Sequence, residues 1–187
     1  AARRNPPRRG PMRTAAAALL SVLLGAPFLA GCARSHRAEP SGVTLVEFQE
    51  GVDAGRMVAG WSGFERTEEG LTFVWAVGTS SSVRLGPASR APHTIELRAW
   101  AFDFPGAPPQ DAVVFVNGCR VAELRLSPAP ADYAIATPWS VWTDGTNVLS
   151  FAFSRADAPR DRVAGATDER PLSVGFDRIL LRPGAVT

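Results

Sequence analysis

The sequence contains no lysine, so arginine supplies all twenty of its basic side chains. Residues 1–31 hold five arginines and no acid, whereas residues 32–187 hold fifteen arginines and all eighteen acids, a net charge of −3. Proteins that bind nucleic acids concentrate basic side chains against the phosphate backbone. The acidic balance of residues 32–187 therefore argues against nucleic acid as a partner.

Histidine is also scarce, with only His36 and His93. Hydrolytic catalysis needs a nucleophile with a base, a pair of carboxylates or a metal cluster. His93 precedes an expected strand, which favours a polar residue at a strand entry over a catalytic base. The pair Glu68-Glu69 lies next to Gly70 and indicates a solvated turn. The sequence thus predicts no catalytic residue and no cofactor, and we expect the protein not to be an enzyme.

Residues 154–171 lack apolar periodicity, and loops of this length are often functional. Four acids in this stretch could offer oxygen ligands to calcium, but arginines are interleaved with them and the spacing does not match an EF-hand. These acids are Asp157, Asp161, Asp168 and Glu169. We expect no metal site here.

The apolar run at residues 15–30 is 16 residues long, shorter than the roughly 20 residues that a transmembrane helix needs. Met12-Arg13-Thr14 precedes the run, and Pro27 lies near its end. This arrangement is typical of a cleaved signal peptide. We interpret Met12 as the start of the protein and residues 1–11 as upstream residues.

The apolar run ends in Leu29-Ala30-Gly31-Cys32, which resembles the lipobox of bacterial lipoproteins. The resemblance implies that residues 1–31 are removed and that Cys32 becomes an N-terminus acylated with chains such as palmitate. It also implies a lipoprotein anchored in a membrane of the cell envelope, facing the periplasm or the cell surface. Residues 32–42 are polar and are then expected to be a tether.

Cysteine is limited to Cys32 and Cys119. If Cys32 is acylated, Cys119 has no intramolecular partner, so we expect no disulfide framework. A reactive thiolate needs a positively polarised site with a base nearby, and the sequence offers no obvious one. We therefore expect Cys119 to be a small buried apolar residue.

From residue 43 onward, no segment keeps a helical period of 3.6. Short apolar or alternating runs recur between clusters of Gly, Pro, Asp and Asn, a pattern typical of strands. Residues 43–183 are expected to form one all-β domain, a sandwich or a barrel. The expected strands are Val43–Phe48, Leu71–Val77, Ser81–Leu85, Thr94–Phe102, Ala112–Val116, Val121–Leu126, Tyr133–Ala136, Asn147–Phe153 and Leu172–Leu181.

The clearest local signal is Asn117-Gly118 between two β-branched runs. Asn and Gly tolerate the positive φ angles of a tight hairpin turn, so a hairpin is expected here. Val121 and Leu124 cannot share one face of a regular strand, which predicts a bulge near Val121–Ala122.

Two further features concern the last strands. Asp144-Gly145-Thr146-Asn147 is expected to turn the chain into the strand that follows it. In the final strand, Asp177 and Arg178 interrupt the apolar pattern, which indicates a strand near the edge of a sheet.

These later segments form a familiar series: "VFVNGCRVAELRL", "DYAIATPW", "DGTNVLSFAF" and "PLSVGFDRILL". The series resembles the later strands of galactose-binding-like jelly-roll domains. The earlier "GWSGFE" and "FVWAVGTSSSVRL" resemble the opening of such modules where they accompany envelope sulfatases and glycosyltransferases. The resemblance implies a jelly-roll β-sandwich. Members of this fold often bind sugars or dock a neighbouring catalytic domain.

Five tryptophans are the remaining candidates for ligand contact. Trp75 and Trp100 lie within expected strands, and core packing is their default role. Trp61 and Trp139 lie in expected loops, where an indole can stack on a sugar ring or close the end of a sandwich. We select Trp61, Trp139 and the nearby Trp142 as possible ligand-binding residues.

Two functions fit this sequence. The first is an envelope lipoprotein whose non-catalytic β-sandwich binds a glycan or an envelope protein. The alternative is the N-terminal accessory domain of a sulfatase-like hydrolase whose catalytic part is absent. The sulfatase motif C-x-P/A-x-R does not occur at Cys32 or Cys119, so this chain would supply only the accessory part.

Overall fold

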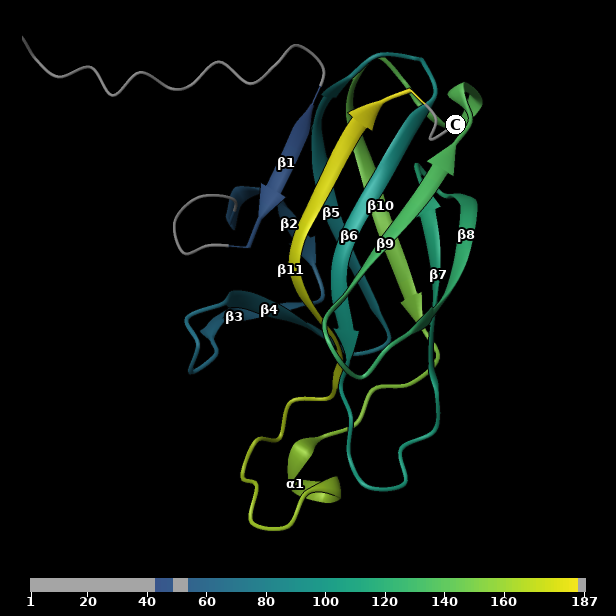
Figure 1. Cartoon of the computed structure of the whole chain (residues 1–187). Coiled ribbons are helices and arrows are strands. Elements are labelled where there is room, and N and C mark those ends of the chain that lie inside the picture. Colours follow the sequence, from purple (N-terminus) through teal and green to yellow (C-terminus); the bar gives the residue numbers. More distant parts are fainter. Residues whose placement is uncertain (1–42, 49–53, 185–187) are drawn as a thin grey trace, which may run out of the picture. The chain divides into compact units, whose positions relative to one another are not determined.

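The computed structural model describes residues 43–48 and 54–184, in which eleven strands form two antiparallel sheets (Figure 1). The predicted leader, the lipobox with Cys32, and the tether lie outside these residues. Short helices are η1 (Ala54–Arg56), η2 (Trp139–Val141) and α1 (Pro159–Arg162). The strands are β1 (Thr44–Glu47), β2 (Met57–Ala59), β3 (Trp61–Arg66), β4 (Thr72–Val77), β5 (Ser80–Ala88), β6 (His93–Ala101), β7 (Gln110–Val116), β8 (Cys119–Leu126), β9 (Ala131–Thr137), β10 (Gly145–Phe153) and β11 (Leu172–Pro183).

One sheet has the order β3-β4-β11-β6-β9, and β1 also pairs with β11. The other sheet has the order β2-β5-β10-β7-β8. Strands that are far apart in sequence thus lie side by side, as in a jelly roll. The predicted all-β jelly-roll sandwich is confirmed, and all nine predicted strands are present, whereas β2 and β3 were not predicted. Within the described residues, no helix is long and apolar enough to cross a lipid bilayer.

The main core lies between the two sheets and follows from strand alternation. In β7 and β10, every second side chain is buried, because successive residues of a strand point to opposite faces. Trp61 belongs to this packing: its ring centroid lies 5.1 Å from that of Phe48 and 5.3 Å from that of Phe176. Its Nε1 donates a hydrogen bond of 2.7 Å to the backbone oxygen of Ser82 in the other sheet. Trp61 is therefore in a strand and not in the expected loop.

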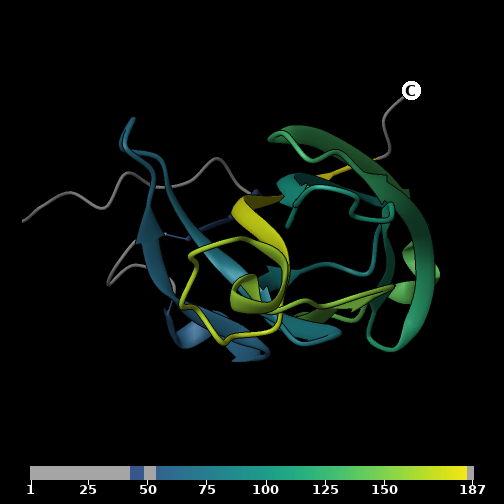
Figure 2. The same ribbon diagram turned by 90° about the horizontal axis from the view of Figure 1, so that it is seen from below.

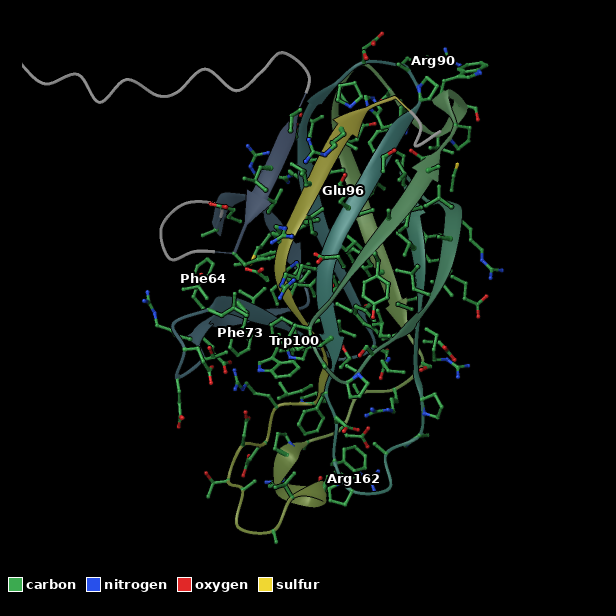
Figure 3. All side chains as sticks on the ribbon, in the orientation of Figure 1. Phe64, Phe73, Arg90, Glu96, Trp100 and Arg162 are labelled. Atoms are coloured by element: carbon green, nitrogen blue, oxygen red, sulfur yellow. The ribbon has the colours of Figure 1, made fainter. Side chains whose placement is uncertain are left out.

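A second aromatic cluster lies on the opposite face of the first sheet. Trp75 and Trp100 alternate with residues of the main core, and their ring centroids are 6.2 Å apart. Phe73 contacts both rings, at 5.6 and 5.2 Å (Figure 3 labels Phe73 and Trp100). Gly175 lies under the Trp100 indole, where an added Cβ would be 2.6 Å from Cζ2 and 2.7 Å from Nε1. A glycine is required here because the indole occupies the place of a side chain.

The hairpin and the bulge that the sequence predicts are both confirmed. Asn117 and Gly118 have φ angles of 49° and 80° and join β7 to β8. Val114 pairs with Ala122 and Phe115 with Arg120, so Val121 is the extra residue of a bulge.

Two predictions from the sequence are wrong: that Cys119 is buried, and that the final strand lies near the edge of its sheet. Cys119 is exposed, because it begins the second strand of the hairpin beside the turn, outside the main core. The final strand β11 is central in its sheet. Its register shifts between Phe176 and Arg178, and the charged pair Asp177-Arg178 lies at this irregularity, where Asp177 contacts Arg98 at 3.5 Å.

Candidate functional site

Few large apolar side chains are exposed in the described part of the chain, and Trp139 is the one aromatic residue among them. Trp139 is 52 % exposed and begins η2, between β9 and β10. Trp142 is 1 % exposed and Trp61 is partly buried against the main core, so neither is as exposed as Trp139. Of the three tryptophans selected from the sequence, Trp139 alone has the exposure that a stacking residue needs.

Asn117 of the β7–β8 turn fixes the position of η2. Its Nδ2 donates to the backbone oxygen of Val141 at 2.9 Å and to Oδ1 of Asn147 at 2.6 Å. Its Oδ1 accepts from the backbone N of Val148 at 3.0 Å. Because the asparagine lies in the positive-φ position of the hairpin, the turn between two strands also supports the segment that carries Trp139.

Asn147, which is fully buried, closes the turn that follows η2. Its Oδ1 accepts from the backbone N of Thr143 at 2.9 Å. Its Nδ2 donates to the backbone oxygens of Thr143 at 3.0 Å and Gly145 at 2.8 Å. A buried amide with its hydrogen-bonding groups satisfied holds the surrounding backbone in one conformation.

Trp142 anchors the same segment in the core. Its Nε1 donates to Oγ1 of Thr137 at 2.8 Å, and this hydroxyl donates to the backbone oxygen of His93 at 2.7 Å. The His93 ring meets the indole at 76°, with centroids 4.7 Å apart. His93 begins β6, as expected of a polar residue at a strand entry. These contacts tie the Trp139 segment to β6 and β9.

Two charged residues adjoin Trp139. The guanidinium carbon of Arg90 lies 4.8 Å from the centroid of a Trp139 ring, within range of a cation–π contact. The backbone N of Arg90 donates to Oδ1 of Asp144 at 3.0 Å. We call Arg90, Trp139 and Asp144 the Trp139 surface. Sequence reasoning missed Arg90, because nothing in the sequence indicates that the β5–β6 loop meets η2.

The Trp139 surface combines three kinds of contact. The indole offers an apolar face, Arg90 offers N–H donors and Asp144 offers a carboxylate acceptor. All three side chains are exposed. The surface can therefore bind an amphipathic solute, and it lacks a nucleophile paired with a base.

The acids of the 154–171 loop are paired with arginines. Asp157 contacts Arg155 at 2.9 Å and Arg162 at 2.8 Å. Hydrogen bonds from Arg170 lower the pKa of Asp168. Asp161 and Glu169 both contact Arg160. In residues 43–48 and 54–184, no group of three His, Cys, Asp or Glu side chains is placed to hold a metal ion.

Among the described carboxylates, Asp177 has a raised pKa, and it lies on the outer face of the first sheet. Burial raises its pKa, while the charges of Arg178 and Arg98 lower it and that of Asp132 raises it. Both arginines lie 3.5 Å from Asp177. The residue is thus part of an ion-pair cluster on the sheet.

Comparison with known proteins gives the following. No model of a protein family matches the chain, and no curated protein matches it in sequence. Among solved structures, a family 35 carbohydrate-binding module from an environmental isolate is 19 % identical, with a TM-score of 0.47 over 76 % of this chain and 98 % of that module. CBM35 from Cellvibrio japonicus Abf62 is 12 % identical, with a TM-score of 0.49 over 78 % of this chain and 96 % of that one. The CBM36-1 domain of a multidomain xylanase from the hindgut metagenome of Trinervitermes trinervoides is 13 % identical, with a TM-score of 0.45 over 78 % of this chain and 100 % of that domain. At these levels of similarity, the names of these modules say nothing about what this chain binds.

Proposed function

We propose that the protein is a non-catalytic glycan-binding module that a lipid-modified N-terminus anchors in the cell envelope, and that the Trp139 surface contacts the glycan. The observation that carries the proposal is a tryptophan that is 52 % exposed on a segment held by Asn117, Asn147 and Trp142. Leaving a large apolar ring in water is unfavourable. A hydrogen-bonded segment that nevertheless presents this ring is well suited to binding.

Stacking explains how such a surface would select a sugar. One face of a pyranose ring carries C–H groups that can pack on the indole, while its hydroxyls need hydrogen-bonding partners. Arg90 can donate to a hydroxyl and Asp144 can accept from one. Because the segment is already ordered, little conformational entropy is lost on binding.

The anchoring part of the proposal rests on the sequence. The arginine-containing leader, the 16-residue apolar run and Leu29-Ala30-Gly31-Cys32 together support acylation of Cys32. A single acyl chain gives only marginal membrane binding, whereas two or more chains hold a protein firmly.

Replacing Trp139 with alanine is expected to abolish glycan binding and to leave stability nearly unchanged. A surface substitution of this kind usually changes the free energy of unfolding by less than about 0.5 kcal/mol. The measurement is retention on a glycan array, together with thermal unfolding, for the wild-type and Trp139→Ala chains. Val58→Ala is the matched control, because Val58 is an apolar side chain that is 47 % exposed. Equal retention of wild type and Trp139→Ala, or no retention of any glycan by the wild type, would contradict the proposal.

The Cys32→Ser chain is expected to accumulate as an unprocessed precursor without lipid label, because serine has no thiol to accept the diacylglyceryl group. Incorporation of radiolabelled palmitate, with the apparent mass on a gel, measures this when the chain is produced in a bacterium that processes lipoproteins. Cys119→Ser is the control and should be labelled and processed as the wild type is. Normal labelling of the Cys32→Ser chain would rule out anchoring through this residue.

A further inference from the structure

The chain enters its first strand at the same end of the sandwich as the Trp139 surface. β1 starts at Thr44, which pairs with Leu181 near the end of β11, and Leu181 pairs in turn with Ile95 near the start of β6. Ile95 pairs with Ile135 of β9, four residues before Trp139. Figure 1 shows β1 starting beside the end of β11, at the top of the view. The segment that leads into β1 therefore joins the domain at this end, which we call the Trp139 end.

The distances at the Trp139 end suit contact with a membrane. β1, β11, β6 and β9 are neighbouring strands, and a spacing of about 4.8 Å puts β9 roughly 14 Å from β1. Residues 33–42 lie between Cys32 and residue 43, and a chain of this length spans at most about 40 Å. An acylated Cys32 therefore keeps the Trp139 end close to the bilayer, within reach of lipid headgroups.

The loops at the Trp139 end carry little charge. They are residues 89–92 between β5 and β6, 117–118 between β7 and β8, and 138–144 between β9 and β10, and their charged side chains are Arg90 and Asp144. One base and one acid give no net charge, so the negative surface of a bilayer does not repel these loops. An exposed tryptophan is suited to the boundary between lipid and water, because its ring is apolar and its N–H is polar.

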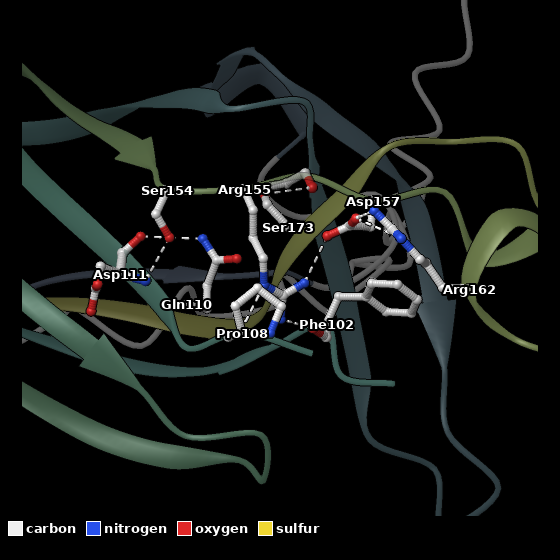
Figure 4. Close-up of polar contacts among 10 residues, drawn as sticks. Phe102, Pro108, Gln110, Asp111, Ser154, Arg155, Asp157, Arg162 and Ser173 are labelled. Atoms are coloured by element: carbon white, nitrogen blue, oxygen red, sulfur yellow. Dashed lines mark hydrogen bonds and ion pairs between the residues drawn. The ribbon is translucent and has the colours of Figure 1, made fainter. Parts of the chain in front are cut away.

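The opposite end of the sandwich is highly charged. The 154–171 loop holds eight charged side chains, and Figure 4 shows Arg155 and Arg162 both contacting Asp157 there. Figure 3 shows Arg90 and Arg162 at opposite ends of the sandwich. Moving charged groups out of water is costly. The Trp139 end is therefore the end that suits an approach to the membrane.

We infer that the glycan bound by the Trp139 surface is the sugar headgroup of a glycolipid in the same membrane that holds the acylated N-terminus. The inference rests on the proposed function, and it adds the location and the lipid nature of the ligand. A glycolipid in that membrane is present at high effective concentration, because the anchor and the ligand share one surface. Trp139 packs against the sugar, Arg90 donates to one hydroxyl and Asp144 accepts from another.

The free thiol of Cys119 allows a test on the full chain. Cys119 is exposed and adjoins the turn at Asn117, which is hydrogen-bonded to the Val141 backbone at the Trp139 end. Acylation blocks the thiol of Cys32, the other cysteine of the sequence, so a donor dye attaches to Cys119 alone. The processed chain is inserted into vesicles of phosphatidylethanolamine and phosphatidylglycerol that carry an acceptor dye on a lipid headgroup. Energy transfer then reports how close the Trp139 end lies to the bilayer.

Plain vesicles are compared with vesicles that also contain glucosyl-, galactosyl- or mannosyl-diacylglycerol. We expect at least one of these glycolipids to raise the energy transfer from Cys119 saturably. The Trp139→Ala chain should lose this rise at an unchanged melting temperature. Val58→Ala should keep it, because Val58 is exposed on β2, outside the three loops. If no glycolipid raises the transfer, or if Trp139→Ala shows the same rise, the inference is overturned.

A dye at the opposite end tests the orientation of the domain. Thr167 is an exposed residue of the 154–171 loop, and the double variant Cys119→Ser, Thr167→Cys moves the dye there. We expect the glycolipid to leave the transfer from position 167 unchanged or to lower it. An equal rise at both positions would show that the whole domain moves onto the vesicle, and would overturn the inference.

The glycan array separates this inference from the proposed function. Suppose that the wild type is retained on the array and that Trp139→Ala is not, while no glycolipid changes the energy transfer. The proposed function then stands and the inference alone falls. If the wild type is retained by no glycan on the array and responds to no glycolipid, both are contradicted.

Discussion

Replacing Trp142 with alanine is expected to lower the free energy of unfolding by about 3–5 kcal/mol, the usual cost of truncating a buried tryptophan. The side chain is 1 % exposed, so its removal leaves a cavity that the surrounding strands can fill only in part. The hydrogen bond from its Nε1 to Oγ1 of Thr137 is lost as well. Chemical denaturation of the full chain, followed by far-ultraviolet circular dichroism, measures the change.

Trp142→Phe tests the reason for this effect, because it keeps most of the apolar volume and removes the hydrogen bond. Its cost should be smaller than that of Trp142→Ala, since Thr137 still donates to the backbone oxygen of His93. Trp139→Ala removes the exposed indole and should lower the free energy of unfolding only slightly. If Trp139→Ala and Trp142→Ala lowered the free energy of unfolding by similar amounts, the two indoles would not differ in burial. The Trp139 surface would then lose its basis as a site.

Arg155→Met is expected to destabilise the fold by roughly 2–4 kcal/mol, because each buried backbone oxygen left without its donor costs about 1–3 kcal/mol. The side chains of Arg155 and Asp157 are only 12 % and 9 % exposed. Without the guanidinium, Asp157 keeps Arg162 as a partner, but the backbone oxygens of Phe102 and Pro108 lose a charged donor. Figure 2, seen from below, shows the loop with α1 lying across this end of the sandwich. Arg155 thus ties the 154–171 loop to the β6–β7 loop.

Arg120→Met is the matched control for Arg155→Met. Arg120 pairs with Glu123, and both side chains are more than half exposed, so the pair should contribute less than about 1 kcal/mol. Arg155→Lys should remain strongly destabilised, because an ammonium cannot reproduce three planar donors. The measurement is again chemical denaturation of the full chain. An Arg155→Met chain as stable as the Arg120→Met chain would show that the buried network does not hold the loops.

Local features of the fold could be predicted because short-range preferences decide them. Asn117 and Gly118 accept positive φ, so the hairpin follows from two adjacent residues. The bulge at Val121 follows from the spacing of apolar residues along one strand. By contrast, the sequence predicts a loop around Trp61, because the glycines and Ser62 there interrupt the alternation. Strand β3 forms there because β4 pairs with it.

The candidate site depended on more distant contacts. Trp61, Trp139 and Trp142 have similar local surroundings of small and polar residues, yet their roles differ. The first packs on Phe48 and Phe176, and the last lies against His93. Arg90 comes to Trp139 from a loop that the sequence does not connect with it. Selecting candidates from the sequence was therefore possible, whereas choosing among them was not.

By itself, the sequence determined the strand alternation, the turn at Asn117-Gly118 and the all-β class, because φ preferences and the two-residue period of a strand act over a few neighbouring residues. Which side chains are buried was decided by the tertiary structure. Cys119 is exposed, although the sequence predicts a buried thiol, and Gln110 is buried, although side-chain amides mostly face water. The physical reason is that burial depends on which strands pair and which face of a sheet a residue occupies, and those contacts join residues far apart in the chain.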